Sequence, residues 1–176
     1  MNETETPEFV NLPTSSATPF PQLVDVQRSA STVQILKDLA YDRHSEMTAA
    51  TTYMHQDWQL YPQYPQIANA LEQIAITEMT HLDALSNAIV AFGGNADYVK
   101  DGDAWTARWV DLGTSLPEML QRNIDAENKA IQSYERAIEN VSNESLKAIF
   151  RKIIEDEQAH IAIFNSIINY LQNQGE

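Results

Sequence analysis

The chain contains no cysteine, and its 176 residues include only 11 lysines and arginines against 25 aspartates and glutamates. Without cysteine, disulfides, thiolate zinc sites and cysteine-ligated iron–sulfur or rubredoxin-type centres are excluded. The formal net charge of −14 argues against nucleic acid and anionic membranes as partners, because both require clustered basic side chains. We therefore expect metal cations among the partners.

Long apolar runs are also absent. No stretch reaches the ~18 apolar residues that a membrane span needs, and no basic segment followed by an apolar run opens the chain. We therefore expect a cytoplasmic location. The length suits one well-buried core and is too short for two.

The first 30 residues have a different composition from the rest of the chain. They contain four of the seven prolines and many serines and threonines, with no periodic apolar pattern. This composition is typical of an extended, flexible segment. We predict a tail over residues 1–30 and a folded domain over residues 31–176.

Four stretches of the domain repeat apolar residues with helical spacing, over about residues 31–59, 65–92, 115–138 and 144–172. Pro65 can begin the second helix, and Gly93 with Gly94 can end it. A capping-box pattern, from Ser115 to Glu118, marks the start of the third. The links are short except after the second helix. The pattern predicts an all-α, antiparallel four-helix bundle with one long crossover between helices 2 and 3.

Two Glu-x-x-His pairs lie within the predicted second and fourth helices, namely Glu78 with His81 and Glu157 with His160. Residues three apart lie on one face of a helix, so each pair can offer an oxygen and a nitrogen ligand to one ion. One such pair is weak evidence for a metal site. The residues upstream of both pairs strengthen the case.

A lone glutamate precedes each pair, Glu46 by 32 residues and Glu127 by 30. Seven residues after each lone glutamate comes a tyrosine, Tyr53 or Tyr134, two turns along the same face. The chain therefore contains an internal repeat of carboxylate, tyrosine, carboxylate and imidazole. The tyrosines are candidate catalytic residues, although their rings can also pack the core with the hydroxyls bonded to ligand carboxylates.

This set of residues has a chemical requirement. Four glutamates in one core are too costly to ionise together, so they need either protons or about +4 of metal charge. Two divalent ions supply that charge, and oxygen-rich ligation with two imidazoles suits Fe(II) or Mn(II). Two ions ~3.5–4 Å apart can hold O₂ or peroxide between them. A structural bundle that has lost its metals is the alternative.

With these motifs the chain resembles the ferritin-like superfamily, specifically its bacterioferritin and rubrerythrin branch, over about residues 31–172. The resemblance implies a six-residue set of ligands to two iron or two manganese ions. The set comprises the lone-helix ligands Glu46 and Glu127, the bridging carboxylates Glu78 and Glu157, and the terminal imidazoles His81 and His160.

The chain also departs from its apparent relatives. Rubrerythrins typically carry a further glutamate three residues after the third-helix ligand, where this chain has Ala130, and this weakens a peroxidase interpretation. They usually append a cysteine-rich electron-transfer domain, so a peroxidase here would need an external electron donor. Met79 occupies the place of the haem-binding methionine of bacterioferritins. We do not expect haem, because methionine on an amphipathic helix more often fills an interface or core.

The resemblance predicts a di-metal oxidoreductase that uses O₂ or hydrogen peroxide in iron handling or oxidative-stress defence, of the ferroxidase or peroxide-reducing type. Two alternatives remain open. One is a manganese catalase-like dismutase, and the other is an iron-storage or structural assembly protein. The long tail and the irregular crossover favour a homodimer over a 24-subunit shell.

A last prediction concerns the residues that precede the two pairs, Asp156 and Thr77. Metal-bound histidine usually donates its other ring N–H to a carboxylate or carbonyl. We expect Asp156 to accept that bond from His81, and Thr77 to be a weaker acceptor that faces His160. The alternative for Asp156 is a solvated charge beside Glu155.

Overall fold

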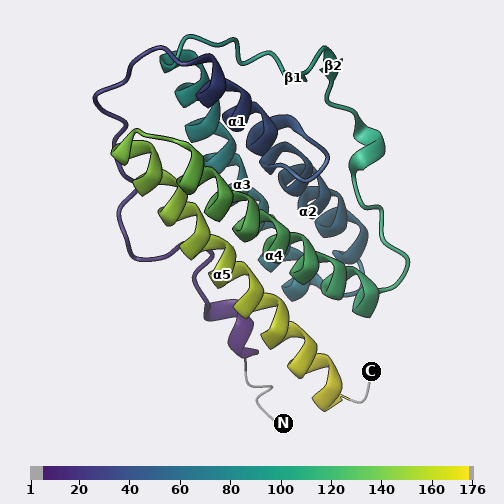
Figure 1. Cartoon of the computed structure of the whole chain (residues 1–176). Helices are drawn as coiled ribbons and strands as arrows, with labels where there is room; N and C mark the ends of the chain where they lie inside the picture. Colours follow the sequence, from purple (N-terminus) through teal and green to yellow (C-terminus); the bar gives the residue numbers. More distant parts are fainter. Residues whose placement is uncertain (1–5, 175–176) are drawn as a thin grey trace.

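The computed structural model describes residues 6–174. Its long helices are α1 (Ala30–Tyr41), α2 (Glu46–Leu60), α3 (Pro65–Ala91), α4 (Leu116–Asn140) and α5 (Glu144–Gln174). Helix α2 packs along α3, and α4 packs along α5 (Figure 1). The predicted all-α bundle with one long crossover is confirmed. No described helix has the length and apolar character needed to cross a membrane.

The prediction of one helix over residues 31–59 is wrong, because the chain breaks between α1 and α2. Asp42 and Ser45 have extended backbones, with ψ of 179° and 169°. The Asp42 carboxylate accepts hydrogen bonds from the Arg43 backbone N–H at 2.6 Å and from Lys100 Nζ at 2.6 Å. The bond from the Arg43 N–H is local and competes with helical hydrogen bonding, while Lys100 lies 58 residues away. A new helix therefore begins at Glu46.

Other helix boundaries follow the predicted signals. Pro65 is the first residue of α3, and Gly93 lies just beyond its end with a left-handed φ of +92°. The capping-box pattern marks the start of α4 correctly, but the hydrogen bonds of a capping box do not form there. Ser115 makes no side-chain capping bond, and the Glu118 carboxylate accepts a hydrogen bond from the Thr114 hydroxyl instead.

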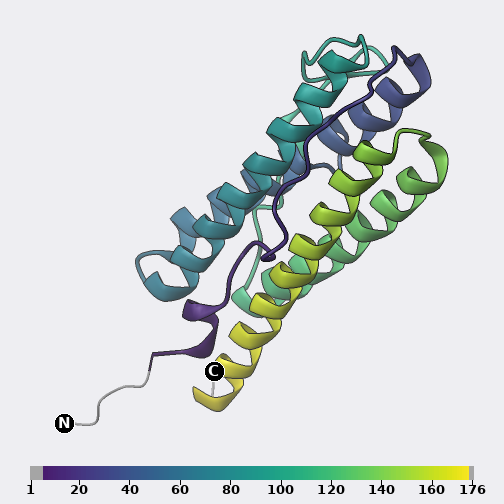
Figure 2. The same ribbon diagram turned by 90° about the vertical axis from the view of Figure 1, so that its left-hand side faces the viewer.

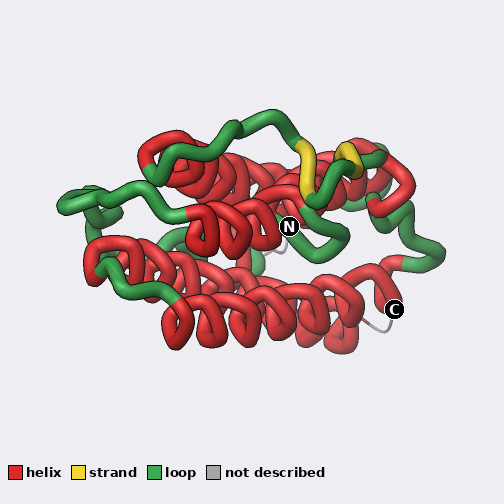
Figure 3. The backbone as a smooth tube through the Cα atoms, turned by 45° about the horizontal axis from the view of Figure 1, so that its top comes forward, coloured by secondary structure: helices red, strands yellow, loops and turns green. Residues whose placement is uncertain are grey.

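The crossover joins α3 to α4 through residues 92–115 and carries the chain from one end of the bundle to the other (Figure 1). It contains the antiparallel strands β1 (Val99–Lys100) and β2 (Asp103–Ala104) and the 3-10 helix η2 (Ala107–Trp109). The strands lie outside the helices (Figure 3). Trp105 Nε1 donates to Thr48 Oγ1 at 2.9 Å, which fixes the crossover to α2.

The described part of the N-terminal segment, residues 6–29, runs along the bundle between α3 and α5 (Figure 2). It begins with the 3-10 helix η1 (Glu8–Asn11), from which Phe9 enters the core with 1% of its surface exposed. Thr77 Oγ1 on α3 donates to Thr14 Oγ1 at 2.9 Å. Nothing in the composition of the segment indicated these contacts with the helices.

The apolar core consists of two clusters separated along the bundle axis. One cluster joins α1 to the end of α3, the end of α4 and the start of α5. The other joins α2 to the start of α3, the start of α4 and the end of α5. The six candidate ligands lie between the clusters, on the start of α2 and on the middle turns of α3, α4 and α5.

Candidate metal centre

Six ionisable side chains meet in the middle of the bundle, and none is more than 3% exposed. Their oxygen and nitrogen atoms form two groups, each with all its ligand atoms within 4.8 Å of one another. One group is Glu46, Glu78, His81 and Glu157, and the other is Glu78, Glu127, Glu157 and His160. Glu78 and Glu157, the shared glutamates, belong to both groups. Glu46 and Glu127, the lone glutamates, belong to one each.

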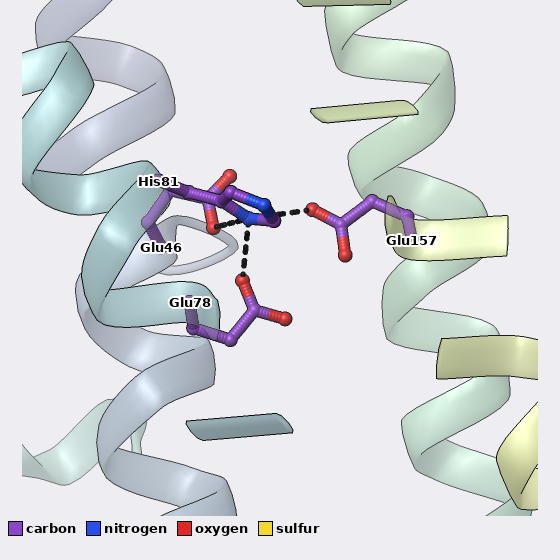
Figure 4. A group of neighbouring side chains, drawn as sticks. All are labelled: Glu46, Glu78, His81 and Glu157. Atoms are coloured by element: carbon purple, nitrogen blue, oxygen red, sulfur yellow. Dashed lines mark hydrogen bonds and ion pairs between the residues drawn. The ribbon is translucent and has the colours of Figure 1, made fainter. Parts of the chain in front are cut away.

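The shared glutamates direct one oxygen toward each imidazole. Glu78 Oε2 lies 3.2 Å from His81 Nδ1, while Glu78 Oε1 lies 3.1 Å from His160 Nδ1. Glu157 Oε1 lies 3.5 Å from His81 Nδ1, and its Oε2 lies 2.9 Å from His160 Nδ1. Figure 4 shows the first group, with Glu157 facing the other three residues from the opposite side of the bundle. Two carboxylates placed in this way can each contact two ions.

Each lone glutamate completes one half. Glu46 Oε2 lies 3.5 Å from His81 Nδ1, and Glu127 Oε1 lies 3.5 Å from His160 Nδ1. Glu46 is the first residue of α2, whereas Glu127 lies in the middle of α4. The break before α2 therefore sets the position of one of the candidate ligands.

The two tyrosines bond crosswise to the lone glutamates. Tyr53 on α2 donates its hydroxyl to Glu127 Oε1 at 2.5 Å, and Tyr134 on α4 donates to Glu46 Oε1. Burial, followed by the charge of the neighbouring glutamates, raises the pKa of both tyrosines well above 10. Both hydroxyls are therefore neutral donors that link each lone glutamate to the opposite helix.

The buried oxygens show what the cluster lacks. Within residues 6–174, Glu78 Oε1 and Glu157 Oε1 lie near imidazole nitrogens, at 3.1 and 3.5 Å, but neither oxygen accepts a hydrogen bond. A buried carboxylate oxygen without a donor is costly, and a cation would satisfy it. Four carboxylates and two imidazole nitrogens are a donor set suited to Fe(II) or Mn(II). The arrangement fits a centre of two metal ions.

Protons take the place of that charge in the metal-free protein. Burial and the Glu78 charge raise the pKa of Glu46 to about 8, and burial with the shared glutamates raises the pKa of Glu127 well above its ordinary value. Burial opposes charge on both imidazoles, but the facing carboxylates raise their pKa values well above 6.5. Burial is likewise outweighed at the shared glutamates, whose pKa values are lowered by the imidazoles. These raised pKa values favour the protonated forms of the two lone glutamates and the two imidazoles, which offsets part of the carboxylate charge.

The outer ring nitrogen of His81, Nε2, contacts a buried carboxylate. His81 Nε2 lies 3.1 Å from Asp156 Oδ2, and Asp156 is 1% exposed. The other carboxylate oxygen accepts hydrogen bonds from Lys152 Nζ at 2.5 Å, from the Ser16 backbone N–H at 2.6 Å and from Ser15 Oγ at 3.1 Å. Burial opposes ionisation of Asp156, but His81 and Lys152 lower its pKa to about 2. The aspartate is charged at neutral pH.

The outer nitrogen of His160 is different. His160 Nε2 is buried and has no hydrogen-bond partner within the part of the chain that the structure describes. The expectation that Thr77 faces this ring is wrong. The Thr77 hydroxyl bonds instead to Thr14 in the N-terminal segment and to the Gln73 carbonyl one turn earlier in α3.

Sequence reasoning missed several of these groups. Lys152, 3% exposed, lies four residues before Asp156, and that ion-pair spacing is the one signal that would have found it. Gln56 and Asn123 exchange two amide hydrogen bonds, of 3.1 and 2.7 Å, that join α2 to α4. Neither residue belongs to a motif.

The family model described as rubrerythrin matches residues 38–168 of this chain. A bacterioferritin from Desulfovibrio desulfuricans is 27% identical over 153 residues, which cover 85% of this chain and 80% of the relative. A probable manganese catalase from Clostridium acetobutylicum is 21% identical over 154 residues, with 75% and 68% covered.

Solved structures give the same picture of the fold. A manganese catalase from Anabaena superposes with a TM-score of 0.80 at 23% identity, over 89% of this chain and 80% of that chain. The Desulfovibrio desulfuricans bacterioferritin, whose structure includes a di-iron site, superposes with a TM-score of 0.69 at 28% identity, over 84% and 83%. Both likenesses cover most of the chain.

Proposed function

The chain belongs to the rubrerythrin family, and we propose that its six buried side chains hold two iron or two manganese ions for oxidoreductase chemistry on O₂ or hydrogen peroxide. The observation that carries this proposal is the placement of the shared glutamates. Each of them directs one oxygen to His81 and the other to His160. Carboxylates in such positions could hold both ions at once.

The protein's own residues prepare the site for this role. Two ions held close together can each exchange one electron with an oxygen species. Tyr53 and Tyr134 hold the lone glutamates in place from opposite helices, and their neutral hydroxyls keep a proton beside each carboxylate. The two apolar clusters on either side keep water away along the bundle axis. Where the clusters exclude water, charge interactions are stronger.

A manganese catalase-like dismutase is the second candidate, favoured by the likeness in sequence to a probable manganese catalase. It differs from the first in its need for electrons. Dismutation of peroxide releases O₂ without a reductant, whereas an iron ferroxidase consumes Fe(II) and a peroxidase requires an external electron donor. The presence of Ala130 in place of a further carboxylate disfavours a rubrerythrin-type peroxidase.

The test is metal analysis of protein purified without added metal, followed by peroxide addition in an oxygen electrode. We expect two iron or two manganese ions per chain, and loss of both in Glu78→Ala. Oxygen evolution without reductant would assign the dismutase, and consumption of Fe(II) would assign the ferroxidase. A folded chain that binds neither metal would contradict the proposal. The expected homodimer stays a prediction that sedimentation tests.

A further inference from the structure

A cavity of about 430 Å³ lies between α2 and α4 and extends inward to the candidate centre. Its deep end is formed by all four glutamates and both tyrosines, namely Glu46, Glu78, Glu127, Glu157, Tyr53 and Tyr134. A water molecule occupies about 30 Å³ of liquid, so hydrogen peroxide would fill a small part of this volume. Pockets of roughly 300–1,000 Å³ are typical of sites for organic ligands.

Small side chains on both helices leave this space open. Ser45 and Ala49 line the cavity from the start of α2, and Ala126, Ala130 and Ser133 line it from α4. Ala130, which occupies the position of the missing carboxylate, is part of this wall.

The crossover covers the cavity and is attached to both helices. Trp109 and Val110 contribute apolar surface to the lining. The Asp111 backbone N–H donates to Thr52 Oγ1 on α2 at 3.3 Å, and the Asp111 carboxylate lies 3.3 Å from Arg122 Nε on α4. The cover is therefore held in place, and the cavity has fixed, partly apolar walls.

Basic residues gather around the opening. Four of the 11 lysines and arginines of the chain line this one cavity: Arg43, Arg108, Arg122 and Lys129. All four are exposed. Arg122 pairs with Asp111 and Glu118, but the other three form no ion pair with any residue of the described chain. Asp111 and Asp125 also line the cavity, but Asp111 pairs with Arg122 and Asp125 accepts a hydrogen bond from Gln121. The three cations without an ion pair among the described residues therefore favour an anionic ligand.

We propose that this cavity binds a small organic anion, with its carboxylate near Arg43 and Lys129 and its apolar body between the walls of α2, α4 and the crossover. The inference rests on the proposed function, because two divalent ions would neutralise the four glutamates at the deep end. It adds an organic anion to the O₂ or peroxide of the proposed function, because peroxide alone needs neither this volume nor these cations.

The test uses benzoate as the probe and protein loaded with two Mn(II) ions per chain. Calorimetric titration is expected to show saturable binding that weakens about tenfold or more in Arg43→Gln combined with Lys129→Gln, because charge-assisted hydrogen bonds are lost. Arg151→Gln, which removes an exposed charge on α5 away from the cavity, is the matched control and should bind normally. Benzyl alcohol, which has the same ring without the charge, should bind more weakly.

A second variant tests whether the ligand enters the cavity. Ala130→Leu fills part of the space, and should abolish benzoate binding while manganese content and melting temperature stay unchanged. If benzoate binding is lost in the charge variant but retained in Ala130→Leu, benzoate binds to the basic residues at the rim and does not enter the cavity. That result would overturn the proposal. Fully loaded wild-type protein that does not bind benzoate would do the same. Failure to load manganese would instead count against the proposed function.

Discussion

The two halves of the candidate centre have the same ligands but different surroundings. On one side, His81 Nε2 contacts Asp156, which Lys152 and the Ser16 N–H hold in place. On the other side, His160 Nε2 is buried without a partner among the described residues. The internal repeat therefore gives both halves the same ligands, but only the half with His81 has a carboxylate that contacts the outer nitrogen of its imidazole. Part of that support comes from the N-terminal segment, which lies outside the repeat.

This difference should make the two metal positions unequal. A ring held by an outer carboxylate is already oriented for its ion and is a stronger base. Glu46, in the same half, begins α2, where the helix dipole favours its negative charge, whereas Glu127 lies in mid-helix. We expect the half that contains His81 and Glu46 to bind its ion more tightly.

The largest expected effect comes from the glutamates that the halves share. Glu78→Ala or Glu157→Ala should remove both ions, because each carboxylate contacts both imidazoles. Glu46→Ala and Glu127→Ala should each leave about one ion, in the half that they do not belong to. Metal content after gel filtration gives the answer. Equal residual metal in all four variants would exclude bridging by the shared glutamates.

In the metal-free protein the two halves should no longer differ in metal binding, and the protons on the glutamates and imidazoles should determine how stability depends on pH. Glu46, with its pKa raised to about 8, and both imidazoles favour folding while protonated, so their contribution is present at low pH and lost as pH rises. The shared glutamates and Asp156 have lowered pKa values, so their contribution to stability changes only below about pH 4.5. It stays constant over the neutral range, where the protonated groups lose theirs.

The metal-free protein should therefore melt at a lower temperature at pH 8 than at pH 6, by about 5 °C or more. The metal-loaded protein should show less change, because its glutamates are ionised and bound at both values. Thermal melts followed by circular dichroism measure this. A metal-free protein that becomes more stable as pH rises would contradict the assigned protons.

Asp156→Asn should act on one half. We expect the tighter metal-binding step to weaken about 10- to 100-fold, since the ring of His81 loses its charged acceptor. Thr77→Val is the matched control and should have little effect, because Thr77 does not contact His160. Combining Asp156→Asn with Lys152→Met avoids a buried unpaired charge and should not restore affinity. A larger loss of metal affinity in Thr77→Val than in Asp156→Asn would contradict the proposed difference between the two halves.

The smallest effect should come from the N-terminal segment. Ser15→Ala removes hydroxyl contacts to Asp156 at 3.1 Å and to Lys152 at 2.8 Å. We expect a two- to fivefold weakening of the tighter step, roughly the value of one hydrogen bond. Ser31→Ala, an exposed serine near the start of α1, serves as control. If both variants titrate like the wild type, the segment does not support the centre.

Periodic motifs explain what could be predicted from the sequence. The helices repeat apolar residues every three to four positions, and the spacing of Glu78 and His81 needs only helix geometry to bring both side chains to one face. The same spacing in α5, together with the short links, is enough to predict that the six residues meet.

The remaining features depend on contacts between distant segments without periodicity. The break before Glu46 is stabilised by Lys100, 58 residues away from Asp42. The support of Asp156 comes from Ser16, 140 residues earlier. The cavity exists because small residues on α2 and α4 face each other beneath the crossover, and no local pattern encodes that arrangement.

The most direct test of a two-metal centre with unequal halves is calorimetric titration of the metal-free protein with Mn(II) at pH 7 in buffers of different ionisation enthalpy. We predict two ions per chain in two distinguishable steps, with release of about four protons in total, from the two lone glutamates and the two imidazoles. Binding of a single ion, or of two equivalent ions with no proton release, would contradict it.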